Sequence, residues 1–179
     1  FGMMVGLTAL TAWAPKLVHA LSSTSSNSTV GLLVTIPSVV GLVAMIVISR
    51  SSDRMLERRY HVAIPAIVAG IALVLLGATR SPVYSVGLLS LVGIGVYGFL
   101  APFWALPNEF LSGFSAAAGI ALINSVGNLG GFAGPYLVGA IAARTGNIYA
   151  GLAIAGVALF MSAVLVWLLP RRARALANG

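Results

Sequence analysis

The 179-residue sequence contains no cysteine and only three acidic residues, and charged residues make up 7% of it. The absence of cysteine excludes disulfide scaffolds, zinc ribbons and thiol catalysis. Because a soluble domain carries roughly a quarter of charged residues, an ordinary soluble globule, a disordered chain and a nucleic-acid binder are also excluded. What the chain has instead is apolar: 59% of its residues are hydrophobic and its mean hydropathy is +1.04.

Six uncharged stretches have the length of membrane spans. A hydrocarbon core of about 30 Å needs about 20 apolar helical residues. The stretches cover residues 1–17, 30–49, 62–79, 81–107, 110–143 and 145–169, the first being short and the fifth long enough to include a loop. Residues 71–76 do not alternate between apolar and polar as barrel strands do. We therefore predict an all-α membrane fold, with six transmembrane helices over residues 1–170 and a basic tail over residues 171–179. Because the chain starts at Phe1, we expect a fragment with a truncated first helix.

Basic residues are distributed unequally between the two sides of this predicted bundle. One side carries seven of them, Arg50, Arg54, Arg58, Arg59, Arg171, Arg172 and Arg174, and the other carries Lys16, Arg80 and Arg144. Because cytoplasmic loops are enriched in Lys and Arg, the first side is expected to be cytoplasmic, and with it the C-terminus. The net charge of +7 then reflects topology, and no nucleic-acid partner is expected.

Ionisable side chains are nearly absent from the predicted spans. Asp53 and Glu57 lie in the basic segment, Glu109 lies at a helix end, and His19 and His61 lie near span ends. Metal-ligand clusters, carboxylate pairs and nucleophile–histidine sets are therefore missing at membrane depth, where an intramembrane hydrolase would need them. We expect no enzyme activity, no metal and no cofactor.

Two amides share one face of the fifth span. Asn124 and Asn128 are four residues apart, and a helix that starts near Ser115 places Asn124 about 14 Å along its axis, near the bilayer centre. An unpaired amide in an apolar medium costs roughly 2–7 kcal/mol, so both should face a cavity or a partner. They could bind a polar solute at a midplane site or form hydrogen bonds between helices. Ser125 is a further candidate contact, although a serine there commonly donates to a carbonyl of its own helix.

Small residues are interleaved with these amides. Gly127 and Gly131, and likewise Gly130 and Gly134, have the four-residue spacing that lets helices approach closely. Pro135 follows and predicts a kink. The stretch is expected to serve helix packing, or to let the helix slide or bend during gating.

Two aromatic residues near the end of the fourth span are further candidates. Trp104 is either an anchor at the membrane interface or a ring that stacks on substrate and closes an inner gate. Tyr97, two turns earlier, could add a hydroxyl to the same pathway or contact only lipid and core.

The basic segment 49–59 is predicted to be a cytoplasmic loop. Asp53 near a helix end could accept backbone N–H bonds, while Arg54 and Arg58 pair with it or with Glu57. Such a cluster could lock two helices in one state and release them in another; the alternative is a plain basic loop that only follows the charge bias.

Several of these motifs resemble the anion:cation symporter family of the major facilitator superfamily. Asp53-Arg54 resembles the loop signature of that superfamily in its C-terminal half, with Ser49 in place of the usual glycine. The stretches that resemble the symporter family are 57–65, 104–107, 110–113 and, most specifically, 119–135. The resemblance covers nearly the whole chain and implies helices seven to twelve of a twelve-helix carrier.

The resemblance also implies a function. The family is similar to proton-coupled carriers of organic anions such as tartrate, sugar acids and aromatic acids in the bacterial inner membrane. It implies that Asn124 and Trp104 line the substrate site, that Asp53 and Arg54 belong to a conformational loop, and that a missing N-terminal six-helix half supplies the coupling carboxylates and anion-binding arginines. Two alternatives remain open: a facilitator-type carrier for sugars or drugs, and a membrane scaffold or sensor component that transports nothing.

Overall fold

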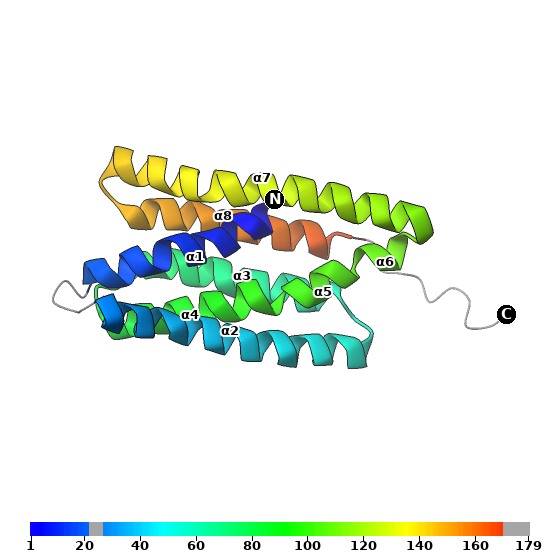
Figure 1. Ribbon diagram of the computed structural model, residues 1–179, viewed down its shortest axis with the longest axis horizontal. Coiled ribbons are helices and arrows are strands. Elements are labelled where there is room, and N and C mark those ends of the chain that lie inside the picture. The colour runs from blue at the N-terminus through cyan, green and yellow to red at the C-terminus, as the bar shows by residue number, and fades with distance from the viewer. Residues whose placement is uncertain (22–26, 170–179) are drawn as a thin grey trace.

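A computed structural model describes residues 1–21 and 27–169. In this part of the chain the elements are all helical (Figure 1): α1 (Gly2–Leu21), α2 (Asn27–Met55), α3 (Arg59–Leu75), the 3-10 turn η1 (Leu76–Ala78), α4 (Pro82–Gly98), α5 (Leu100–Ala105), α6 (Pro107–Phe110), α7 (Gly113–Thr145) and α8 (Ile148–Trp167). The predicted basic tail, residues 171–179, lies outside the described residues.

The predicted all-α membrane fold is confirmed. Within the described residues, five helical stretches are long and apolar enough to cross a membrane: α2, α3 with η1, α4 to α6, α7 and α8. The sixth helix, α1, has 20 residues but carries Lys16 and His19, which lower its hydropathy. It nevertheless packs against α7, α8, α4 and α2 inside the bundle.

One predicted boundary is wrong. The second span is predicted to end at residue 49, but α2 continues to Met55, because polar residues can extend a helix beyond the apolar core. The predicted fifth stretch, 110–143, contains a connection as expected, but a short one: residues 111–112 join α6 to α7. The rest belongs to α7, one helix of 33 residues capped by Gly146 with a φ of 65°. At 1.5 Å per residue it is about 50 Å long, so it extends past a hydrocarbon core of about 30 Å.

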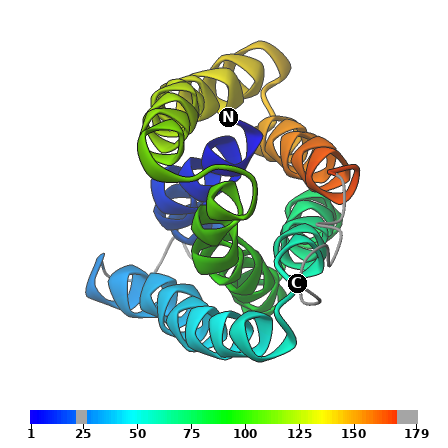
Figure 2. The same cartoon turned by 90° about the vertical axis from the view of Figure 1, so that its right-hand side faces the viewer.

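The helices form an arc in which two members are poorly covered. Figure 2 shows α7 and α2 at opposite ends, with α1 and α4 between them and with α8 and α3 on the other side. Only 11% of the apolar window of α2 and 17% of that of α7 is buried, against 50% for α3. The uncovered faces of α2 and α7 are therefore available for contacts that the described residues do not supply.

Close helix crossings hold the arc together. Where α2 and α4 cross, a Cβ atom on Gly93 would lie 2.4 Å from the carbonyl oxygen of Pro37. Where α3 and α8 cross, Gly70 and Gly156 face each other's carbonyl oxygens in the same way. Without a hydrophobic driving force between helices in lipid, such backbone contacts supply the van der Waals packing that holds helices together.

Candidate functional site

A small pocket joins the two strongest sequence candidates. Its volume is about 40 Å³, and it lies between α1, α5 with the preceding Phe99, and the middle of α7. It is lined by Phe1, Met3, Met4, Phe99, Leu100, Phe103, Trp104, Ile123, Asn124 and Gly127. Asn124 and Trp104, twenty residues apart in sequence, thus meet in one site, and the amide of Asn124 is its most polar group.

Aromatic packing positions Trp104. Its ring meets that of Phe103 edge to face, with centroids 5.4 Å apart and an angle of 77°, and Phe103 meets the buried Phe99 similarly at 6.5 Å and 71°. Edge-to-face pairs of this kind contribute about 0.5–1.5 kcal/mol each. The ring of Trp104 is therefore held by a series of aromatic contacts that reaches the core, and the sequence analysis missed Phe103, since adjacent aromatic residues carry no specific signal.

The polar residues of α7 lie on its uncovered side. Asn124 and Asn128 are exposed, and in the described part of the chain neither amide hydrogen-bonds to another helix. Ser125 donates its hydroxyl to the carbonyl of Ala121 at 2.9 Å. Asn124 lines the pocket and Asn128 does not, so the two amides differ although they share a helix face.

Tyr97 lies apart from this pocket. Its ring lies over Gly41 of α2, where a Cβ atom would be 2.4 Å from the Tyr97 Cδ2 atom. The structure thus places Tyr97 at the crossing of α2 and α4, not beside Trp104.

The glycine stretch of α7 faces α1. Gly127, Gly130 and Gly134 are buried. A Cβ atom on Gly134 would lie 2.7 Å from the hydroxyl oxygen of Thr8, and one on Gly131 would lie 3.7 Å from Met4. These residues let α7 lie close to α1, and Pro135 lies within the same continuous helix. A role of the stretch in gating remains a prediction.

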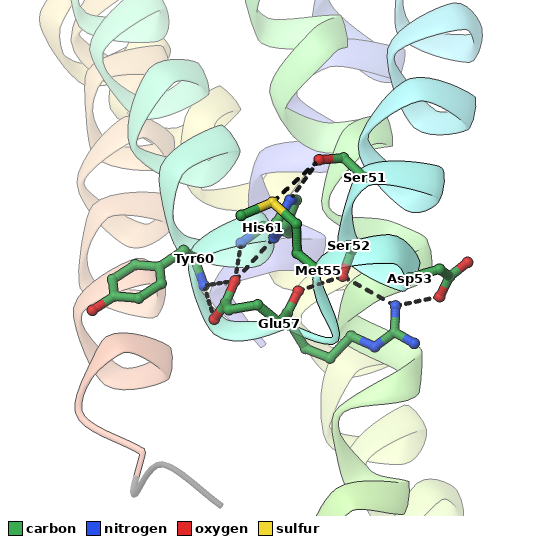
Figure 3. Close-up of polar contacts among 8 residues, drawn as sticks. Ser51, Ser52, Asp53, Met55, Glu57, Tyr60 and His61 are labelled. Atoms are coloured by element: carbon green, nitrogen blue, oxygen red, sulfur yellow. Dashed lines mark hydrogen bonds and ion pairs between the residues drawn. The ribbon is translucent and has the colours of Figure 1, made fainter.

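The turn between α2 and α3 forms a second cluster (Figure 3). The predicted loop is much shorter than expected: Asp53 and Arg54 belong to the last turn of α2, and only residues 56–58 connect it to α3. Leu56 has a φ of 50°, and the N–H of Glu57 donates to the carbonyl of Ser52 at 3.2 Å. This is the Schellman arrangement that ends helices, with leucine where glycine is usual.

Glu57, rather than Asp53, accepts the backbone N–H bonds. Its carboxylate accepts from the N–H of Tyr60 at 2.8 Å and from that of His61 at 3.3 Å, both in the first turn of α3. The prediction for Asp53 is wrong because Asp53 lies at the C-terminal end of α2, where carbonyls and not N–H groups are unpaired. A carboxylate is stabilised at a helix N-terminus by the helix dipole.

Asp53 pairs instead with Arg58. The Nη1 atom of Arg58 donates to the Oδ1 atom of Asp53 at 2.5 Å and to the hydroxyl of the buried Ser52 at 3.0 Å. Ser52 in turn donates to the carbonyl of Glu57 at 2.6 Å. Arg54 forms no ion pair with Asp53 or Glu57 in the described part of the chain.

His61 joins the two helices at this turn. Its Nδ1 atom lies 2.9 Å from the Glu57 carboxylate and its Nε2 atom lies 3.0 Å from the hydroxyl of Ser51 on α2. Arg59 donates to the carbonyl of Trp167, which connects the start of α3 to the end of α8. The sequence analysis did not anticipate the contacts of Ser51 and Ser52, because serine pairs near a helix end are common and unspecific.

We predict that Leu56→Gly stabilises the chain. A non-glycine residue in the left-handed region costs about 1–2 kcal/mol, and Leu56→Gly removes this cost. The greater flexibility of glycine in the unfolded chain reduces the resulting gain by about 0.5–1 kcal/mol. Because Leu56 is 82% exposed, little packing is lost, and thermal unfolding in detergent should show a gain of about 0.5–1 kcal/mol. Met55→Gly, in the last helical position, should instead destabilise; equal losses for both variants would contradict the assignment.

We predict that Glu57→Ala weakens the same turn. The variant loses the N–H bonds at the start of α3 and the contact to His61, so the free energy of unfolding should fall by about 1–2 kcal/mol. Arg54→Gln is the matched control, since Arg54 forms no ion pair with Asp53 or Glu57. Identical thermal unfolding midpoints for Glu57→Ala and Arg54→Gln would show that the carboxylate is not a cap.

Comparisons with known proteins assign the family. A family model described as the Major Facilitator Superfamily matches residues 1–178. The chain belongs to the major facilitator superfamily. Within the described residues, no group of three or more metal-binding side chains accompanies the two clusters above.

Curated relatives of this superfamily member are all named as transporters. A quinolone resistance transporter of Acinetobacter baumannii is 37% identical over 89% of this chain, and a protein of Agrobacterium vitis whose assigned name is tartrate transporter is 37% identical over 96%. The metabolite transport protein NicT of Pseudomonas putida is 33% identical over 96% of the chain. The matches cover 36%, 38% and 39% of these relatives, so the chain spans well under half of their length. No solved structure matches the chain.

Proposed function

We propose that this chain forms the C-terminal six-helix half of a secondary transporter for small organic anions, of the anion:cation symporter type. The observation that carries the proposal is the amide of Asn124, which has no hydrogen-bond partner in the described chain and lines a pocket beside Trp104. At about 17 Å from the first residue of α7, this amide lies at a depth where an unpaired polar group is costly unless it serves a ligand or a partner.

The uncovered helices support a second half. Facilitators of this kind work by alternating access, in which one bundle rocks against another around a central site. Figure 2 shows α2 and α7 at opposite ends of the arc with α1 between them, and their exposed faces are where an N-terminal six-helix bundle would pack. The α2–α3 cluster, with its Asp53–Arg58 pair, would then stabilise one state of the cycle at the cytoplasmic end.

Charge placement supports the orientation. All three acidic residues and four basic residues of the described chain lie at the end formed by the α2–α3 turn and α6. Together with Arg171, Arg172 and Arg174, which the sequence places after α8, these four make seven of the ten lysine and arginine residues, and such a bias is typical of the cytoplasmic side. We infer a multi-pass protein of the bacterial inner membrane with a cytoplasmic C-terminus, coupled to protons.

Uptake by the complete carrier tests the substrate class. Cells that lack their own uptake system and express the carrier should accumulate radiolabelled tartrate or a sugar acid, and a proton uncoupler should abolish the accumulation. Uptake of neutral sugars but of no organic anion would contradict the proposal. The quinolone resistance transporter among the relatives and the apolar, aromatic pocket favour a drug carrier as the second candidate, which quinolone efflux from the same cells would reveal.

We predict that the 179-residue chain alone does not transport. The helices α2 and α7 are poorly covered, and within the described residues no lysine, arginine or histidine side chain lines the pocket. Proteoliposomes that contain the chain alone should show no saturable, proton-driven uptake of tartrate, whereas the complete carrier should. Saturable uptake by the chain alone would overturn the need for a second half.

A further inference from the structure

The uncovered face of α1 carries one cation at the end opposite the α2–α3 turn. Thr11, Pro15, Lys16 and His19 are exposed, whereas Leu10, Ala14 and Leu17 behind them are buried. The same helix reaches the pocket at Met4. Lys16 is twelve residues further along, about 18 Å at 1.5 Å per residue, and it is the single lysine of the sequence.

An aromatic ring holds this lysine. The Nζ atom of Lys16 lies 4.4 Å from the centroid of the Trp13 ring. That ring packs on α7, where its Cζ2 and Cη2 atoms lie 3.2 Å and 3.4 Å from the Cβ position of Gly139. A cation–π contact is electrostatic and leaves the ammonium charge and its N–H donors in place. Trp13 thus positions the ammonium group without neutralising it.

No carboxylate in the described chain competes for Lys16. The three acidic residues, Asp53, Glu57 and Glu109, lie in the last turn of α2, the α2–α3 turn and α6, at the opposite end of the bundle (Figure 1). The ion pairs of the described residues join only Asp53 with Arg58 and Glu57 with His61. At the Lys16 end, Arg80 donates to the carbonyls of Gly77 and Thr79 and lies over the Tyr149 ring, 4.5 Å from its centroid.

We propose that Lys16, positioned by Trp13, is a carboxylate-binding subsite that receives an organic anion before it reaches the pocket beside Asn124. The inference rests on the proposed function. A carboxylate and an ammonium form charge-assisted hydrogen bonds, which are stronger than neutral ones. Among the described residues, no lysine, arginine or histidine side chain lines the pocket, so we assign to Lys16 the contact of this half with the charge of the substrate. An uncovered cation at the entrance accelerates the encounter with anions and acts mainly on KM.

The test is uptake kinetics in the complete carrier at low and high ionic strength. Lys16→Gln should raise the KM for tartrate about tenfold at low salt with Vmax unchanged, and the difference should shrink toward high salt. Lys16→Arg should keep the wild-type KM, and Trp13→Leu should raise it by a smaller factor. Arg144→Gln is the matched control. It removes one positive charge from an exposed residue in the last turn of α7, at the same end of the bundle as Lys16, and it should change KM less than twofold.

A subsite is contradicted if Lys16→Gln leaves KM unchanged, which would leave Lys16 and Trp13 as anchors at the membrane interface. The subsite is also contradicted if Lys16→Gln and Arg144→Gln shift KM equally. That result would indicate that positive charge anywhere at this end of the bundle attracts the anion, without a specific contact to Lys16. A binding measurement separates this inference from the proposed function: carrier in nanodiscs with 13C-labelled lysine is titrated with tartrate, and the Lys16 signal is assigned from Lys16→Arg. A saturable shift of that signal supports the subsite even if uptake is absent, and no shift overturns it.

Discussion

Asn124→Ala is expected to reduce organic-anion uptake by the carrier about 10- to 100-fold. The variant loses a hydrogen bond to the charged substrate, and a hydrogen bond to a charged group contributes about 1.5–3 kcal/mol. The side chain is exposed and makes no hydrogen bond within the described chain. Its removal therefore takes nothing from the bundle, and membrane insertion and thermal stability should stay at wild-type values.

Two comparisons make this result specific to the pocket. Asn128→Ala removes the neighbouring amide outside the pocket and should lower uptake less. Val157→Ala, on the outer face of α8, should have no effect on uptake. If Asn124→Ala leaves uptake intact but lowers the thermal unfolding midpoint, the amide stabilises helix packing and the site assignment is wrong.

Gly93→Val is expected to cause a large loss of stability. The first added carbon would lie 2.4 Å from the carbonyl oxygen of Pro37, which is backbone and cannot rotate away. Overpacking of this kind costs about 2–3 kcal/mol, and α2 and α4 would have to separate. At roughly 2–4 °C per kcal/mol for a chain of this size, the unfolding midpoint should fall by about 4–12 °C.

Gly87→Val on the same helix is the matched control. A Cβ atom at Gly87 meets no atom within 4 Å. Both variants therefore change the helix propensity of α4 equally, but only Gly93→Val places a side chain where α4 crosses α2. Equal unfolding midpoints for the two variants, measured in the same detergent, would show that the α2–α4 crossing is not as close as the structure places it.

Hydrophobic length predicted the fold because a membrane leaves few options for the backbone. Six apolar stretches imply six helices, since each N–H and C=O in lipid needs a partner in its own segment. Helix ends were harder to predict. The connection expected within 110–143 is limited to residues 111–112, because α7 extends beyond the apolar core. In the same way, α2 continues through Arg50 and Asp53 until Leu56 ends it.

The site was predicted in part. The cost of burying an amide identified Asn124 from sequence, whereas its proximity to Trp104 comes from a pocket that α1, α5 and α7 line together, which no spacing reveals. The opposite happened at the α2–α3 turn: both carboxylates were found, but the capping role belongs to Glu57, because the position of a helix end decides which backbone groups are unpaired. Lys16 and Trp13 are only three residues apart in sequence, a spacing that predicts no ligand site. The structure adds that their side chains are in contact and that Lys16 is exposed on α1.

The central claim is that Asn124 faces a water-filled path in the middle of the membrane. Since this chain contains no cysteine, Asn124→Cys in a cysteine-free carrier can be exposed to a small, water-soluble thiol reagent, with Val157→Cys on the outer face of α8 as the control. We expect the cysteine at position 124 to react, tartrate to slow the reaction, and the cysteine at position 157 to stay unmodified. A cysteine at position 124 that is inert, or that reacts no faster than the one at position 157, would place this side of α7 against lipid and contradict the claim.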